Sequence, residues 1–253
     1  MADSPLAHTQ VPRLALVLPT YNEAANLERM LRDIQQTLDA AGLAQHEIIV
    51  VDDDSPDGTG DLADSLTAAS AGRVRALRRR GERGLATAVV AGWKLARSEV
   101  LAVMDADGQH PSSVVPQLLQ ALDEGADVAV ASRYIAGSGI SRWNPVRLVA
   151  SKLATVITRL ALPPAARGIR DPLSGCFALR RAVIEGVELK PLGFKILLEV
   201  LMRGRYSSVR EVSYVFAARG AGKSKLGARV ALLDAMQLAR SAWQTRHSSR
   251  PRK

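Results

Sequence analysis

Short apolar runs alternate with longer amphipathic segments along most of the chain. The runs are almost continuously apolar, as parallel strands are when helices cover both of their faces. The segments between them carry apolar residues at helical spacing; Asn22, for example, is a candidate N-cap for a helix over 23–41. This alternation predicts an α/β fold with a mainly parallel sheet flanked by helices. The predicted strands are 14–18, 47–51, 74–77, 100–104, 127–131, 177–179 and 209–216, and the predicted helices are 23–41, 60–69, 84–96, 111–124, 143–162 and 226–243.

Polar loops follow three of these predicted strands. They span residues 19–23, 52–59 and 105–109, and the last two are rich in aspartate. Parallel strands present their carboxyl ends at one edge of the sheet, which is where such sheets bind ligands. We therefore expect the three loops to meet in one site.

Asp105 and Asp107 come directly after the apolar run 100–104. Residues two apart in an extended chain share a face, so both carboxylates can point the same way. With the amide oxygen of Gln109 nearby, they form a set of hard oxygen ligands that suits Mg²⁺ or Mn²⁺, and such a metal usually also binds substrate phosphates. The alternative is a polar turn that merely ends a strand.

The net charge of +9 is unevenly distributed. Residues 1–125 carry 11 Lys and Arg against 18 Asp and Glu, a net −7, whereas residues 126–253 carry 23 against 7, a net +16. The basic half is expected to face nucleic acid, a phospholipid surface or a phosphorylated substrate, or else to be a solvated surface. Only 4% of the residues are aromatic and no recognition motif is evident, so no nucleic acid is expected.

The cellular location is constrained by what the chain lacks. Cys176 is the only cysteine, which excludes an internal disulfide framework and fits a reducing compartment such as the cytoplasm. No signal peptide and no uncharged apolar run of membrane-spanning length are evident. The predicted helix 143–162 has apolar and basic residues, and it fits an interfacial membrane helix or packing on the core equally well.

Seven short motifs occur in order over about residues 13–230, and together they carry a resemblance. The ordered set resembles the inverting GT-A glycosyltransferases of family 2, and in particular the dolichyl- and polyprenyl-phosphate mannosyltransferases. The motifs are VLPTYNE at 17–23, VDDDSPDGT at 51–59, DADGQHP at 105–111, SRY at 132–134, DPLSG at 171–175, GFK at 193–195 and SKL at 224–226.

The resemblance implies a domain organisation and a reaction. A single GT-A domain of the nucleotide-diphospho-sugar transferase type would cover 13–243, including the helix at about 143–162, between an extension at 1–12 and a basic disordered tail at 244–253. The enzyme would transfer mannose from GDP-mannose to a polyprenyl phosphate with inversion, giving a β-mannosyl phosphate lipid and GDP. Alternatively, UDP-glucose or another sugar nucleotide is the donor, and a nucleic-acid-binding module is the distant alternative.

The resemblance also implies roles for individual residues. Asp105, Asp107 and Arg133 would be catalytic, and the metal ligands would be Asp105, Asp107 and Gln109, binding Mg²⁺ or Mn²⁺. The acceptor phosphate would be bound by Arg133, Ser174 and Lys195. The nucleotide sugar would be bound by Pro19, Tyr21, Glu23, Val51, Asp53, Asp105, Ala106, Asp107, Gln109, Arg133, Arg219 and Lys225.

The chain departs from the family pattern at two positions. Gly108 replaces the usual leucine of the aspartate motif, and Lys223 stands where glutamate is expected. Many relatives also carry a C-terminal transmembrane region, which this sequence lacks. The resemblance therefore implies a peripheral enzyme on an anionic membrane at its cytoplasmic face, or a chain anchored by a separate membrane protein.

Overall fold

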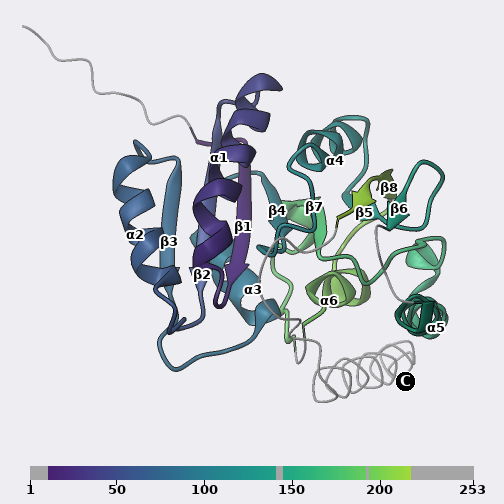
Figure 1. Cartoon of the computed structure of the whole chain (residues 1–253). Helices are drawn as coiled ribbons and strands as arrows, with labels where there is room; N and C mark the ends of the chain where they lie inside the picture. Colours follow the sequence, from purple (N-terminus) through teal and green to yellow (C-terminus); the bar gives the residue numbers. More distant parts are fainter. Residues whose placement is uncertain (1–10, 141–144, 192–193, 218–253) are drawn as a thin grey trace, which may run out of the picture.

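The computed structural model describes residues 11–140, 145–191 and 194–217 (Figure 1). A seven-stranded sheet in the order β3-β2-β1-β4-β7-β5-β8 forms its centre, and β6 and β9 form a separate two-stranded sheet. The strands are β1 (Leu14–Thr20), β2 (His46–Asp52), β3 (Val74–Arg78), β4 (Val100–Met104), β5 (Val128–Ser132), β6 (Gly139–Ile140), β7 (Cys176–Arg180), β8 (Val209–Ser213) and β9 (Val215–Phe216).

The sheet is parallel except at β7, which runs antiparallel to both of its neighbours, β4 and β5. This confirms the predicted mainly parallel α/β fold. The helices are α1 (Ala24–Ala40), α2 (Thr59–Ala69), α3 (Leu85–Leu95), α4 (Val114–Asp123), α5 (Pro145–Ala161) and α6 (Ile196–Arg203), with 3-10 turns at Pro164–Ala166 and Arg181–Val183.

Helices cover both faces of the sheet, which is why its strands are so apolar. Apolar residues of α1, α2 and α4 pack on one face in a single buried cluster, and those of α3 and α6 pack on the other. Gly92 lets α3 approach the sheet closely, because a Cβ there would lie 2.7 Å from a methyl group of Val17. The two layers hold the strand ends, and the loops that follow them, in fixed positions.

Two local expectations prove wrong, and one helix was not expected. Asn22 does not cap α1: its φ is +56°, Glu23 is the N-cap residue, and Asp57 Oδ2 accepts the first helical N–H at 3.1 Å. The predicted strand 209–216 divides into β8 and β9, which belong to different sheets. Helix α6 was not predicted, because its eight residues are too few for periodicity to distinguish a helix from a buried strand.

Helix α5 exposes its apolar residues where the structure describes them. Leu153, Val156, Ile157 and Leu160 are 51–79% exposed, which rules out core packing for these four side chains. The helix borders a hollow of about 430 Å³ that Arg159 and Arg167 also line. Among the residues described, none of the helices is long and apolar enough to cross a bilayer. The predicted helix 226–243 and the tail 244–253 lie outside the described residues.

Candidate active site

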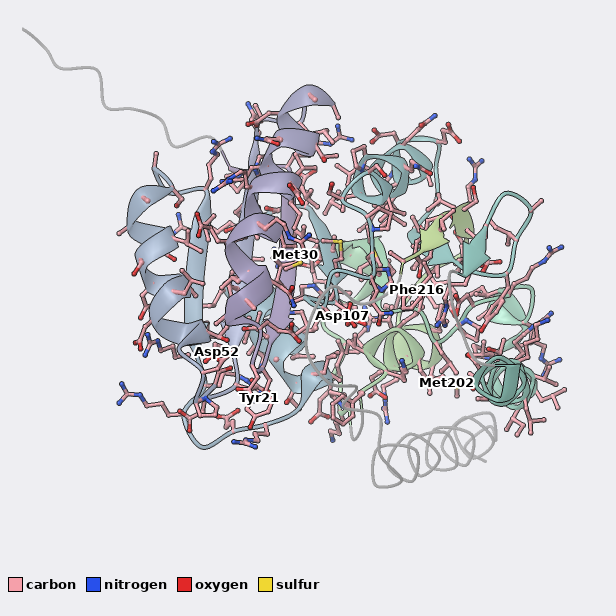
Figure 2. All side chains as sticks on the ribbon, in the orientation of Figure 1. Tyr21, Met30, Asp52, Asp107, Met202 and Phe216 are labelled. Carbon is pink, nitrogen blue, oxygen red and sulfur yellow. The ribbon has the colours of Figure 1, made fainter. Side chains whose placement is uncertain are left out.

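The three polar loops meet at one edge of the sheet, as predicted. Strand β1 pairs in parallel with β2 on one side and with β4 on the other, so their carboxyl ends lie side by side. Figure 2 marks Tyr21, Asp52 and Asp107, which belong to the three loops or to the strand end beside them. Pro19 and Val51, both predicted to contact the nucleotide, are direct register partners in β1 and β2.

The loops after β1 and β2 are hydrogen-bonded to each other. The backbone N–H of Asn22 donates to Ser55 Oγ at 2.9 Å, and that of Glu23 donates to Thr59 Oγ1 at 2.9 Å. Burial alone would raise the pKa of Asp57, but hydrogen bonds from Thr59 and from the first N–H groups of α1 and α2 hold it below the ordinary value. The charged Asp57 side chain therefore links the two loops through its hydrogen bonds.

Asp53 lies just beyond β2, and its carboxylate is held from inside the protein. Arg79 Nε and Nη2 donate to its two oxygens at 2.7 and 2.9 Å, and the N–H of Gly84 donates to Oδ2 at 2.7 Å. Both side chains of this ion pair are 6–7% exposed. Beside it, the Arg83 guanidinium lies 4.4 Å from the centre of the Tyr21 ring.

The predicted metal ligands follow β4 in a tight loop. Ala106 is buried, Asp105 and Asp107 are partly exposed, and Gly108 takes a φ of +73° that favours glycine. The side chain of Asp107 accepts the Gln109 N–H at 3.0 Å, which closes the loop. The Gln109 amide donates to Ala217 O at 3.1 Å, and the Ala217 N–H donates back to Gln109 O at 2.9 Å. The metal loop is thus tied to the chain that leaves β9.

Gly175, just before β7, makes room for the carboxylate of Asp105. The Asp105 N–H donates to Gly175 O at 3.2 Å, and a Cβ added at Gly175 would lie 2.6 Å from Asp105 Cγ. Carboxylate and amide oxygens are the donors that Mg²⁺ and Mn²⁺ prefer, so the residues present fit the predicted metal. Within the described residues no group of three or more His, Cys, Asp or Glu side chains is placed to hold a metal ion. Mg²⁺ bound by one or two carboxylates usually takes its other ligands from substrate phosphates and water.

His110 is a buried, uncharged neighbour of this loop. Burial, with the positive charges of Arg133 and Lys195, lowers the pKa of His110 to about 3. Its ring stacks on Tyr214 at 5.2 Å and meets the Phe216 ring edge-on at 5.3 Å, and its Nε2 lies 3.9 Å from Asp105 Oδ2. Being neutral near pH 7, it packs the base of the site without adding a charge.

Arg133, just beyond β5, is fixed by Asp171. Its Nε and Nη2 donate to the two oxygens of Asp171, both at 2.7 Å, and the Asp171 carboxylate also accepts the Arg133 N–H at 3.0 Å. Burial disfavours the charge of Arg133, but the ion pair with the fully buried Asp171 raises its pKa above the ordinary value. Arg133 therefore carries a permanent charge beside His110.

The structure describes Lys195 and Ser174 but not all of the remaining predicted residues. Lys195 is partly buried at the N-cap of α6, and its positive charge acts on His110. The Ser174 hydroxyl is engaged in a turn with the backbone of Cys176, donating to its oxygen at 3.1 Å; its role on the acceptor stays a prediction. Arg219 and Lys225 lie outside the described residues.

No individual role was predicted for Arg79, Asp171 or Gly175, which contact the predicted site residues Asp53, Arg133 and Asp105. One signal for Arg79 was available: it lies in the basic run 78–80 within a half of the chain that is acidic overall. Asp171 and Gly175 belonged to a recognised motif, but their partners lie more than 35 residues away in sequence.

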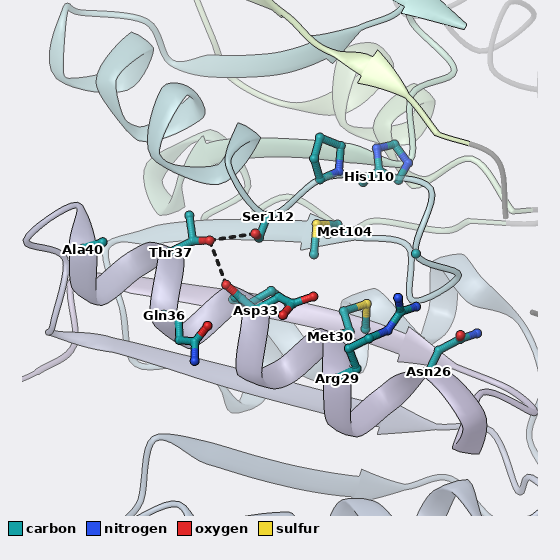
Figure 3. Close-up of a pocket in the computed structure, with 13 residues that line it drawn as sticks. Asn26, Arg29, Met30, Asp33, Gln36, Thr37, Ala40, Met104, His110 and Ser112 are labelled. Carbon is teal, nitrogen blue, oxygen red and sulfur yellow. Dashed lines mark hydrogen bonds between the residues drawn. The ribbon is translucent and has the colours of Figure 1, made fainter. Parts of the chain in front are cut away.

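A separate cavity of about 550 Å³ lies behind the metal loop, between α1 and residues 108–112 (Figure 3). Thr37 and Ser112 share a hydrogen bond of 2.7 Å across its end, and Thr37 also donates to Asp33 O. Arg29 and Asp33 give its wall one charge of each sign. The cavity touches the metal loop at Gly108 and His110 but does not include the two aspartates.

Known proteins resemble this chain over most of its length. A dolichol-phosphate mannosyltransferase of Pyrococcus furiosus is 47% identical over 214 residues, which are 85% of this chain and 59% of that protein. A polyprenol monophosphomannose synthase of Mycolicibacterium smegmatis is 38% identical over 88% of this chain and 84% of its own. A dolichol-phosphate mannosyltransferase of Saccharomyces cerevisiae is 34% identical over 88% and 85%. This chain therefore spans only about three fifths of the length of the first relative.

Solved structures share the fold. Mannosyl-3-phosphoglycerate synthase from Rubrobacter xylanophilus superposes with a TM-score of 0.70 at 20% identity, covering 92% of this chain and 75% of that one. A mannosyltransferase from Pyrobaculum calidifontis, solved with GDP-Man and Mn²⁺, gives 0.61 at 17% identity, with 96% and 66% covered. The family model described as glycosyl transferase family 2 matches residues 15–187. This fold, this edge of carboxylates and this match together show that the chain belongs to glycosyl transferase family 2.

Proposed function

We propose that this protein transfers mannose from GDP-mannose to a polyprenyl phosphate of the dolichyl type, inverting the anomeric centre and releasing GDP. The observation that carries the proposal is the convergence of Asp105 and Asp107 with Arg133 and Lys195 around one sheet edge. Such a site can bind two phosphate-bearing substrates. The names of three relatives, all mannosyl transferases acting on dolichol or polyprenol phosphate, support this substrate pair.

The donor nucleotide would lie across the ends of β1 and β2. Tyr21 has a partly exposed ring, and the carboxylates of Glu23 and Asp53 are buried, like the neighbouring strand residues Pro19 and Val51. A GDP-mannose complex of a structural relative supports a guanosine donor. UDP-glucose or another sugar nucleotide is the alternative donor for the same edge.

The diphosphate would lie beside the metal loop. Asp105, Asp107 and Gln109 would bind Mg²⁺ or Mn²⁺, and the bound ion would neutralise the charge that develops on the leaving GDP. Two structural relatives were solved with Mn²⁺. Ala106, whose side chain is buried beneath the loop, would offer its backbone to the diphosphate.

The acceptor phosphate would approach from the side of Arg133 and Lys195. A lipid phosphate is already anionic near pH 7, so it attacks without a general base. The work of this chain is then to hold two negatively charged substrates close together and in line. Arg133 suits this task because Asp171 fixes its guanidinium in one orientation, and Arg219 and Lys225 would add positive charge. In-line attack converts an α-linked donor into a β-linked product.

Helix α5 is the proposed contact with an anionic membrane. Its exposed residues Leu153, Val156, Ile157 and Leu160 would enter the interfacial region, while Lys152 and Arg159 would meet acidic headgroups. This arrangement would keep the enzyme on the cytoplasmic face of the membrane, beside a lipid that cannot leave it. A separate anchoring protein is the alternative means of attachment.

The proposal is tested by transfer of radiolabelled mannose from GDP-mannose to a short polyprenyl phosphate, with Mg²⁺ or Mn²⁺ and with EDTA. We expect label in the lipid phase only when metal is present. Transfer from UDP-glucose instead would move the donor assignment but keep the acceptor. No transfer from either donor would contradict the proposed function.

A further inference from the structure

Arg79 uses every one of its N–H donors inside the protein. Nε and Nη2 donate to Asp53, Nη2 also donates to Gly84 O at 3.2 Å, and Nη1 donates to Thr87 Oγ1 at 3.0 Å and Glu82 Oε2 at 3.2 Å. Its side chain is 6% exposed. Arg79 therefore cannot bind a nucleotide itself, and whatever it does for the reaction it does through the groups it holds.

Protein N–H groups fill most of the acceptor positions of Asp53. Its carboxylate has about four lone-pair positions. Arg79 fills one on each oxygen and the Gly84 N–H fills the second on Oδ2, which leaves one on Oδ1.

The loop that carries Arg79 also organises the neighbouring surface. Residues 79–84 connect β3 to α3 and reach the loops after both β1 and β2. Arg83 covers the ring of Tyr21 at 4.4 Å, and Gly84 reaches Asp53 with a φ of +146° that side chains rarely adopt. The aromatic ring and the single acceptor are thereby fixed next to one another before any ligand arrives.

We propose that Arg79 is a positioning residue that sets nucleobase selectivity, by holding the Asp53 carboxylate so that its remaining lone pair accepts a hydrogen bond from the base. This rests on the proposed function, in which the nucleotide lies across β1 and β2. A base with a ring N–H at its pairing edge, guanine or uracil, donates to Asp53. Adenine and cytosine present a lone pair at that position, which the carboxylate repels.

The test measures affinities of GDP, ADP, UDP and CDP by isothermal titration calorimetry in the presence of Mn²⁺. For the unsubstituted protein we expect GDP to bind at least about tenfold more tightly than ADP, and UDP to bind at least about tenfold more tightly than CDP, as one charge-assisted hydrogen bond allows. In Arg79→Met the GDP/ADP and UDP/CDP affinity ratios should both fall below about threefold. Arg79→Lys keeps the charge but loses the planar fork, so its ratios should be intermediate.

The matched control is Arg80→Met, which removes an exposed arginine from the adjacent position and should leave both ratios unchanged. Asp53→Asn should lower both affinity ratios as far as Arg79→Met does. The double variant should lower them no further, because the two residues act as a unit. Circular dichroism shows whether each variant folds. If Arg79→Met does not fold, Arg79→Lys decides the question.

A folded Arg79→Met protein that keeps the wild-type GDP/ADP and UDP/CDP ratios would overturn the inference, whatever its stability. A purely structural arginine would lower the melting temperature and weaken all four nucleotides equally. The proposed function fails differently: through absence of mannosyl transfer, or through a preference of UDP over GDP, with the selectivity between bases intact.

Discussion

Gly175 offers a quantitative test of how the metal loop is built. A Cβ at this position would lie 2.6 Å from Asp105 Cγ, whereas carbon atoms in contact are about 3.5 Å apart. In Gly175→Ala the Asp105 carboxylate must therefore move by about 1 Å. A displacement of that size at a reacting centre costs about 100-fold in rate, which corresponds to about 2.7 kcal/mol of activation free energy.

The assay is mannosyl transfer at saturating GDP-mannose, together with Mn²⁺ affinity measured by electron paramagnetic resonance. We expect turnover of Gly175→Ala to fall about 100-fold and Mn²⁺ binding to weaken. Gly168→Ala is the control, since no atom lies within 4 Å of the Cβ it would add and neither glycine has a φ in the left-handed region. Wild-type turnover and Mn²⁺ affinity in folded Gly175→Ala would refute the reasoning.

Three further predictions concern the metal, the membrane and Asp57. Asp107→Ala should lower turnover at least 100-fold, since one lost electrostatic contact costs about 3 kcal/mol; near-wild-type turnover would remove Asp107 from the metal site. Val156→Asp combined with Leu160→Asp should reduce sedimentation with anionic vesicles at least tenfold, whereas Val11→Asp, at an exposed apolar position on a different part of the chain, should not. Because the pKa of Asp57 is lowered by folding, its stabilising effect is present above the ordinary pKa of 3.8 and is lost as pH falls through the folded value. The melting temperatures of wild type and Asp57→Asn should therefore differ more at pH 6 than at pH 3, and a constant difference would contradict this role.

The elements that the sequence predicted best are those whose signal is local. Strand β4 (Val100–Met104) was predicted with its observed bounds, because five apolar residues directly precede a polar turn. The positions of Asp105 and Asp107 followed from the same short stretch. Parallel pairing then brought them to the edge that also carries Tyr21 and Asp53.

The features that the sequence did not predict depend on contacts between distant segments. Asp53 meets Arg79 across 26 positions, and nothing near either residue shows that the charge is buried and paired. Asn22 has the residue type of a cap, but its backbone turns into the left-handed region and Asp57 takes over the task. Helix α6 has only eight residues, too few for its spacing of apolar residues to be told from that of a buried strand.

The reversed direction of β7 decides which end of this strand lies at the candidate active site. A strand of five residues is about 17 Å long. Because β7 is antiparallel to β4, Cys176 pairs with Met104, and the residues that precede β7 arrive at the metal loop. In a parallel orientation the turn holding Asp171 and Gly175 would sit a full strand length away, at the opposite rim. In this sheet the candidate site residues therefore follow the parallel strands in the chain, but precede the antiparallel strand β7.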